Sequence, residues 1–234
     1  MTPPAFSSVG LRFENIDKRY GGLLALRGVS LTIAPGECAV FAGRNGSGKT
    51  TLLRIAARLV RPSRGSLTFS GNQRDGEENA IRPGFVAHAT MVYDELTAEE
   101  NLLLFARLEA VSQPKRRVEA LLKEVGLSDR RSSLVRTFSR GMRQRVAIAR
   151  ALLHEPAVLL LDEPATGLDP QGVTWLAESI RRFRDSGRTI LMSLHGESEI
   201  SSLGTRAIRL DAGSVVADTR TGATFRSILT FADA

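Results

Sequence analysis

The chain has 234 residues, of which 42% are hydrophobic and 24% are charged, a balance typical of a globular protein that buries a sizeable core. No apolar run approaches the ~18–20 residues that cross a bilayer, and the first residues lack the charged-then-apolar pattern of a secretory signal. The net charge of +7 would suit an anionic partner, but its even spread along the chain favours a solvated, arginine-rich surface. The single cysteine, Cys38, excludes an internal disulfide, and its apolar neighbours predict inert packing in a cytosolic protein.

The first third of the chain predicts strands, a glycine-rich loop and one helix. Turn signals at 20–22 and 35–37 separate short apolar runs, which we interpret as strands. The glycine-rich loop leads into a helix with leucine and isoleucine on one face. The polar stretch 71–82 predicts a solvated loop or hairpin. In chain order the strands are expected at 11–13, 29–33, 38–42 and 65–70, and the helix at 50–59.

The middle of the chain predicts helices, and the last third alternates strands with helices. Thr97 and Glu100 form the capping-box pattern that opens a helix, Pro114 is placed to begin a second, and a third is expected from about Met142. This alternation predicts a mainly parallel sheet with helices on both faces, and the helical middle predicts an inserted lobe. The later elements are expected as a strand at 158–161, a helix at 171–186, a strand at 189–193 and a last segment at 207–216.

The segment from Gly43 to Thr50 has the pattern G-x-x-x-x-G-K-S/T of a phosphate-binding loop, placed between a strand and a helix. Glycines let backbone N–H groups approach phosphate oxygens, and the helix start adds the positive end of its dipole. The Lys49 ammonium can reach the β- and γ-phosphates, and the Thr50 hydroxyl is a natural Mg²⁺ ligand. The nucleotide-binding residues predicted here are Gly43, Asn45, Gly46, Ser47, Gly48, Lys49, Thr50 and Thr51.

The apolar strand 158–161 is followed by two carboxylates, Asp162 and Glu163. The carboxyl ends of strands in a parallel α/β sheet face the ligand crevice, so both side chains are expected beside the phosphate loop. Asp162 is predicted to hold Mg²⁺ through water. Glu163 is predicted to orient or deprotonate the attacking water.

The chain contains a second segment typical of an anion-binding helix N-terminus. This feature distinguishes it from small G proteins, kinases and helicases. The segment 138–142 reads FSRGM and places a serine and a glycine at a helix start, about twenty residues before the acidic pair. This arrangement resembles the ABC ATPase family, whose LSGGQ motif occupies this place. The resemblance covers about residues 11–217 and implies an α/β P-loop NTPase fold: a mainly parallel sheet flanked by helices, an N-terminal antiparallel β subdomain and an inserted helical lobe. We expect a single domain over 1–234, with the α/β core and β subdomain at about 1–88 and 156–220 and the helical lobe at about 89–155.

The resemblance also assigns roles to residues outside the phosphate loop. In the family the LSGGQ motif binds the γ-phosphate of a nucleotide held by the other subunit, which implies that Ser139 and Gly141 act in trans. Tyr20 lies where the family stacks an aromatic ring on adenine. His195 lies where the family carries a switch histidine that contacts the γ-phosphate, so it joins Glu163 as a predicted catalytic residue. Asp169 lies in the loop that crosses the dimer interface in the family.

Two positions depart from the family pattern. Arg140 replaces the first glycine of LSGGQ, which puts the strength of the contact in trans in question. His88 stands where the family carries a glutamine that senses nucleotide, and we expect it to contact Mg²⁺ through bound water as that glutamine does.

The segments 86–88 and 92–102, the FSRGM motif and the short length are similar to ATP-binding subunits of haem exporters in cytochrome c maturation. Related exporters of drugs or lipids share pieces of this pattern, and a soluble ABC ATPase of iron–sulfur cluster assembly is a further alternative. A DNA-repair ATPase is disfavoured, because only about 110 residues separate Lys49 from Asp162, without a heptad array or a cysteine cluster.

The predicted function is therefore hydrolysis of ATP, with Mg²⁺, to power a membrane partner. The expected partners are an integral membrane transporter subunit and a second copy of the cassette, paired head to tail on ATP binding; no nucleic acid is expected. The resemblance places such a subunit at the cytoplasmic face of the cell membrane, as a peripheral protein.

Overall fold

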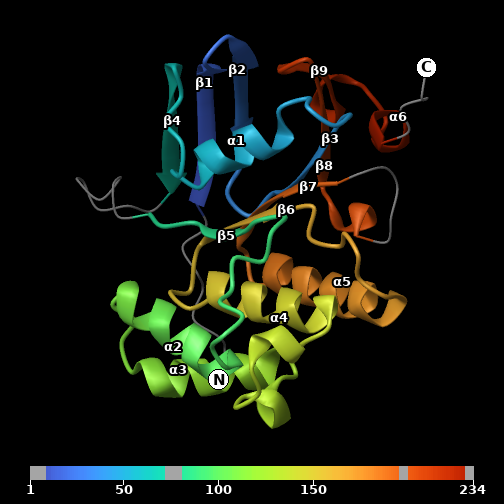
Figure 1. Ribbon diagram of the computed structural model, residues 1–234. Helices are drawn as coiled ribbons and strands as arrows, with labels where there is room; N and C mark the ends of the chain where they lie inside the picture. The colour runs from blue at the N-terminus through green and yellow to red at the C-terminus, as the bar shows by residue number, and fades with distance from the viewer. Residues whose placement is uncertain (1–8, 72–80, 195–199, 230–234) are drawn as a thin grey trace.

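An antiparallel sheet and a mainly parallel sheet pack on opposite sides of helix α1 (Lys49–Ala56) in the computed structural model (Figure 1). The structure describes residues 9–71, 81–194 and 200–229. Most of the predicted loop at 71–82 lies outside this range, as does His195.

The antiparallel sheet has the strand order β2-β1-β4. Its strands are β1 (Val9–Tyr20), β2 (Leu23–Ile33) and β4 (Arg64–Gly71). The first two are much longer than the sequence predicts: Gly28 interrupts β2 with a φ of 57°, and the register of β1 shifts between Phe13 and Ile16, where Asn15 has a φ of 48°. These irregularities break the apolar–polar alternation that reveals a strand in a sequence.

The second sheet has the order β5-β6-β7-β3-β8-β9, and only the pair β8–β9 is antiparallel. The expected last segment at 207–216 is in fact a hairpin, which turns through Ala212 and Gly213, both with positive φ. The inner strands β3, β6 and β7 are buried along their whole length, as parallel strands covered on both faces must be. The strands are β5 (Gly84–Val86), β6 (Val158–Asp162), β7 (Thr189–Ser193), β3 (Cys38–Ala42), β8 (Arg206–Asp211) and β9 (Ser214–Asp218).

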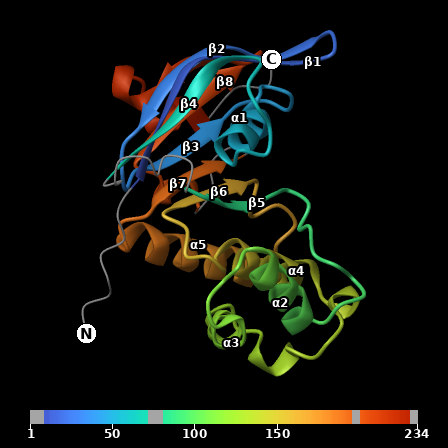
Figure 2. The same cartoon turned by 90° about the vertical axis from the view of Figure 1, so that its left-hand side faces the viewer.

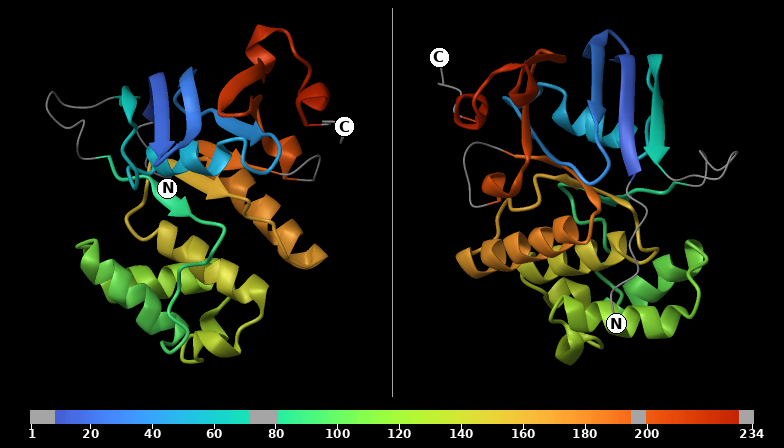
Figure 3. Two further views of the ribbon diagram at one scale, coloured as in Figure 1. Left: turned by 45° about the horizontal axis from the view of Figure 1, so that its top comes forward. Right: turned by 180° about the vertical axis from the view of Figure 1, so that it is seen from behind.

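Helices cover both faces of this sheet. Helix α1 lies on the face toward the antiparallel sheet, while α4 and α5 lie on the other face, with α2 and α3 beyond them (Figures 2 and 3). The capping box predicted at Thr97 and Glu100 is present, and Pro114 is the first residue of its helix. The other helices are α2 (Ala98–Leu108), α3 (Pro114–Glu124), α4 (Arg140–Ala151), α5 (Pro170–Asp185) and α6 (Phe225–Leu229), with short 3-10 helices η2 (Ser128–Arg130), η3 (Val135–Thr137), η4 (Ser201–Leu203) and η5 (Thr219–Thr221).

Two hydrophobic clusters hold these layers together. One joins α1 and the antiparallel sheet to one face of the parallel sheet, and the other joins the opposite face to α4, α5 and the helical lobe. Cys38 is fully buried in the second cluster, and burial raises the pKa of its thiol to about 12, which agrees with an inert packing role. The predicted α/β fold class is confirmed: a mainly parallel sheet flanked by helices, an N-terminal antiparallel sheet and an inserted helical lobe. Within the described ranges, every helix is too short or too polar to cross a bilayer.

Candidate functional site

The phosphate-binding loop connects β3 to α1 and depends on glycines at two positions. Gly43 has a φ of 146°, and a Cβ there would collide with the Leu210 carbonyl oxygen. Gly48 has a φ of 105°, and a Cβ there would lie 2.7 Å from Leu26 Cδ2 and 2.8 Å from the Ala25 carbonyl oxygen. The loop can therefore take this path only if these positions carry no side chain.

Two buried polar side chains of this loop, Lys49 and Ser47, are placed to bind an anion. The Lys49 Nζ donates to the Gly43 and Arg44 carbonyl oxygens at 2.6 and 3.0 Å, inside its own loop. Burial lowers the Lys49 pKa, and the carboxylates of Glu163 and Asp162 oppose this effect. The buried Ser47 hydroxyl makes no hydrogen bond to any residue that the structure describes. Buried polar groups are almost always bonded, so Ser47 and Lys49 fit a loop that holds an anion.

A cavity of about 450 Å³ lies over the loop, which we call the nucleotide cavity. Tyr20, at the end of β1, lines it and is 43% exposed, with Lys18 Nζ 4.9 Å from the centre of its ring. Aliphatic residues of β2 lie beside Tyr20, so this end suits a flat aromatic group and the loop end suits phosphates. Gly43, the first residue of the loop, lines a separate cavity beside β8. The predicted residues that line the nucleotide cavity are Tyr20, Asn45, Gly46, Ser47, Gly48, Lys49, Thr50, Thr51 and Glu163.

The acidic pair lies beside the loop, because β6 and β3 are parallel strands of one sheet and their carboxyl ends lie at the same edge. Asp162 is the last residue of β6 and is 2% exposed, and Thr50 Oγ1 donates to its Oδ1 at 3.0 Å. A hydroxyl and a carboxylate at this spacing are oxygen ligands of the kind that Mg²⁺ prefers, so these residues fit the metal. Glu163 has a φ of 50°, a left-handed conformation that costs a glutamate about 1–2 kcal/mol. Strain of this kind is common at functional sites.

His88 follows β5 and contacts the acidic pair, since its Nδ1 lies 3.3 Å from Glu163 Oε2. The sequence predicts a contact of His88 with Mg²⁺-bound water, whereas the contact found here is with the predicted base.

Ser139 and Gly141 lie at the start of α4, away from the nucleotide cavity. Ser139 caps the helix by accepting the Met142 N–H at 3.3 Å, and both residues line a separate cavity of about 300 Å³. The two cavities share no lining residue, so a single chain does not bring the two anion-binding devices together. The Arg140 side chain packs over Gly167, where an added Cβ would lie 2.5 Å from Arg140 Nε. The arginine in place of glycine is thus accommodated by a glycine after the acidic pair.

Two residues that sequence reasoning missed contact the acidic segment. Gln144 on α4 is buried and donates through Nε2 to the Pro164 carbonyl oxygen at 3.0 Å. Ser193 is the last residue of β7 and bonds to both Asp162 and Glu163. A polar residue at the carboxyl end of an apolar strand is the signal that could have identified Ser193.

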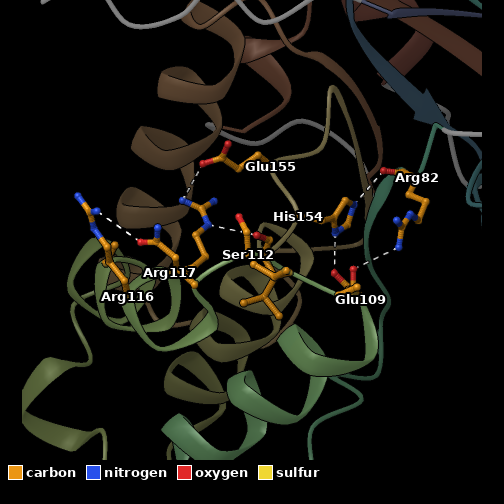
Figure 4. Close-up of a pocket in the computed structure, with 12 residues that line it drawn as sticks. Arg82, Glu109, Ser112, Arg116, Arg117, His154 and Glu155 are labelled. Carbon is orange, nitrogen blue, oxygen red and sulfur yellow. Dashed lines mark hydrogen bonds and ion pairs between the residues drawn. The ribbon is translucent and has the colours of Figure 1, made fainter.

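A larger cavity of about 570 Å³ lies between the ends of α2 and α4 and the start of α3 (Figure 4). We call it the charged cavity, because Arg82, Glu109, Arg116, Arg117, His154 and Glu155 line it. His154 lies between Glu109 Oε2, at 2.7 Å from Nδ1, and the Arg82 carbonyl oxygen, at 2.9 Å from Nε2. Arg117 donates to the Leu152 and Leu153 carbonyl oxygens at 2.6 and 3.2 Å and pairs with Glu155. Apart from Arg116, whose guanidinium bonds to the Gln113 side chain, these charged groups are paired with one another or with the backbone.

Comparison with known proteins agrees with this site. A family model described as "ABC transporter" matches residues 26–166. The chain is 42% identical over 197 residues to the ABC transporter ATP-binding protein NatA of Bacillus subtilis, covering 82% of this chain and 80% of that protein. It is 36% identical over 216 residues to the daunorubicin resistance ATP-binding protein DrrA3 of Streptomyces coeruleorubidus, covering 91% and 68%. It is 34% identical over 220 residues to the Nod factor export ATP-binding protein I of Rhizobium johnstonii, covering 92% and 71%.

Solved structures give the same result. The fold matches a dimeric bacterial ABC transporter cassette with a TM-score of 0.78 at 30% identity, over 89% of this chain and 97% of that one. It matches a dimeric post-hydrolysis cassette bound to ADP and phosphate with the same TM-score at 28% identity and the same coverage. The sequence match, the fold and the phosphate loop with its acidic pair agree, and the chain therefore belongs to the ABC transporter family as an ATP-binding ATPase subunit.

Proposed function

We propose that this chain powers an exporter by binding and hydrolysing ATP at the interface of two cassettes. The observation that carries the proposal is the nucleotide cavity, which brings together Lys49, the acidic pair and the Ser47 hydroxyl, a group with no hydrogen-bond partner among the described residues.

Different residues of the chain would bind the base, the phosphates and the metal, and one would accept a proton. Tyr20 stacks on the adenine, the loop 43–51 binds the phosphates, and Lys49 exchanges its loop carbonyls for phosphate oxygens. Thr50 and Asp162 would hold Mg²⁺, which supplies positive charge against the phosphate oxygens when bound. Glu163 accepts the proton of the attacking water.

The two histidines complete this assignment. His88 orients the Glu163 carboxylate from 3.3 Å, and it would contact the water of a bound Mg²⁺. His195 contacts the γ-phosphate; this role rests on the sequence, since His195 lies outside the described residues.

The proposal of a pair rests on the separation of the two anion-binding devices. Ser139 and Gly141 line a cavity of their own, so they can contact a nucleotide only if a second chain presents one. The match to two dimeric cassettes supports this arrangement. In the pair, the loop of one copy and the α4 start of the other enclose each ATP, and closure moves the membrane partner from the cytoplasmic face.

The cargo that we propose is chosen from the names of the similar proteins. Those named above include a drug-resistance protein and a Nod factor exporter, and none of the three is named for haem. We therefore propose export of a drug-like or lipid-like compound ahead of haem export, and ahead of a soluble role in iron–sulfur cluster assembly.

Glu163→Gln tests the proposed chemistry. The amide keeps the shape of the side chain but cannot accept the proton, so ATP should bind without being hydrolysed and should trap a dimer. Gel filtration with ATP and Mg²⁺ should show the dimer in Glu163→Gln and a monomer in Glu163→Gln combined with Lys49→Ala. Hydrolysis by Glu163→Gln at the wild-type rate would show that the assigned base is wrong.

Purification tests the partner. An affinity-tagged chain drawn from detergent-solubilised membranes should bring an integral membrane protein with it, and the ATPase rate of that complex should rise with its cargo. Comparing amphipathic drugs with haem as stimulants distinguishes the two cargo classes. A chain found only in the soluble fraction, without a membrane protein, would favour the iron–sulfur alternative.

A further inference from the structure

Ser193 is a buried serine at the centre of the acidic site, with no role in the function described so far. It ends β7, and its Cα pairs in parallel register with that of Asp162 at the end of β6. Its side chain is inaccessible to solvent, so its hydroxyl must find its partners inside the protein.

The hydroxyl has two partners, one on each carboxylate residue. Ser193 Oγ donates to Asp162 Oδ1 at 2.7 Å and accepts the Glu163 N–H at 2.9 Å. A serine hydroxyl carries a single proton, and here that proton goes to Asp162. The group therefore acts as a fixed bridge between the two acidic residues.

The bond from Ser193 to Asp162 involves Oδ1 of the carboxylate. Thr50 Oγ1 donates to the same Oδ1 at 3.0 Å, so both hydroxyls bind one oxygen, and neither occupies Oδ2. Two donors on one side fix the rotation of the carboxylate and leave the Oδ2 position to a further ligand.

The bond to Glu163 acts on a strained turn. Glu163 has a φ of 50°, and its N–H also lies 3.2 Å from the Ser193 carbonyl oxygen. Ser193 thus holds this N–H through both its hydroxyl and its carbonyl, at the point where the chain leaves β6. The direction of the Glu163 side chain depends on that turn.

We propose that Ser193 is a positioning residue for ATP hydrolysis, holding Asp162 and Glu163 in the relative geometry that metal binding and water activation require. This inference rests on the proposed function, since it assumes the roles given to the two acidic residues. Outer partners of metal ligands and catalytic groups commonly change metal affinity or activity by about 10- to 100-fold when removed.

The test compares four variants of the full chain: Ser193→Ala, Ser193→Thr, Glu163→Gln and Ser179→Ala. Ser179 is a matched control, because it is also a buried serine, but its hydroxyl donates to the Trp175 carbonyl oxygen within α5. Steady-state ATPase assays give kcat, the KM for ATP and the Mg²⁺ concentration for half-maximal rate. Thermal unfolding shows whether each variant is folded.

Ser193→Ala should lower kcat by about 10- to 100-fold and raise the Mg²⁺ requirement several-fold, with the KM for ATP changed less than about threefold. Ser193→Thr, which keeps the hydroxyl, should recover most of the rate, and Ser179→Ala should retain it. Ser193→Ala with wild-type kcat and Mg²⁺ requirement, or a Ser193→Thr variant as slow as Ser193→Ala, would overturn the proposal. An active Glu163→Gln would contradict the proposed function itself, whereas an inactive Glu163→Gln beside a fully active Ser193→Ala contradicts only the role of Ser193.

Discussion

The charged cavity is larger than the nucleotide cavity, at about 570 Å³ against about 450 Å³, and more charged side chains line it. Size and charge would therefore select it as the binding site. The pairing of its groups indicates the opposite: His154 lies between two acceptors, and Arg117 binds two carbonyl oxygens and Glu155.

The nucleotide cavity has fewer charged side chains than the charged cavity. Within the described part of the chain, the buried Ser47 hydroxyl makes no hydrogen bond, and the Lys49 ammonium donates to two carbonyl oxygens of its own loop. Glu163 adds a strained backbone. Unmade bonds and strain, rather than volume, distinguish a site prepared for a ligand from a network that holds two parts of the fold together.

The largest effect expected from this difference is the loss of ATPase activity when Lys49 is replaced. Lys49→Ala removes the cation that faces the phosphates and should lower the ATPase rate by about 100-fold or more. Arg117→Ala removes a cation of the charged cavity and should leave the rate within about twofold of wild type. Phosphate release from both purified variants measures this contrast, and equal losses would remove the distinction between the cavities.

Substitution of the loop glycines should have a smaller effect, which is measured as a loss of ATP affinity. Gly48→Ala places a Cβ against Leu26 and the Ala25 carbonyl, while Gly46→Ala places one in open space. Both positions have positive φ and share the backbone cost, so the difference between the two variants isolates the collision. ATP affinity, measured with a fluorescent ATP analogue, should fall at least about tenfold further in Gly48→Ala. Equal affinities would mean that the loop moves aside.

Substitutions in the charged cavity should have the smallest effect on the ATPase rate. They should lower the free energy of unfolding instead. Arg117→Ala removes the side-chain donor from the Leu152 and Leu153 carbonyls, of which Leu152 keeps a bond from the Glu155 N–H, and should lower the free energy of unfolding by about 1–3 kcal/mol. Arg116 makes one hydrogen bond to the residues that the structure describes, a 3.5 Å contact with Gln113, so Arg116→Ala should cost less than about 0.5 kcal/mol. Urea unfolding of the two variants tests this; similar losses would show that Arg117 does not support the end of α4.

The sequence predicts the centre of the site better than its surroundings. The phosphate loop and the acidic pair are contiguous motifs with a strand on one side, and the structure places them together. Ser193 and Gln144 act through contacts with segments 31 and 20 residues away, and such contacts have no local pattern. The sequence predicts β1 and β2 too short, because Asn15 interrupts the alternation in β1 and Gly28 interrupts it in β2. It predicts one segment in place of the hairpin β8–β9, because the turn of that hairpin is only two residues long.

The contact between Arg140 and Gly167 has a consequence for protein engineering. Replacing FSRGM with the family's LSGGQ would remove the side chain that covers Gly167, and placing a side chain at position 167 would displace the arginine. The two positions therefore form one exchangeable unit, although they are 27 positions apart in the chain. A motif transplanted between cassettes keeps its packing only if both positions are moved together.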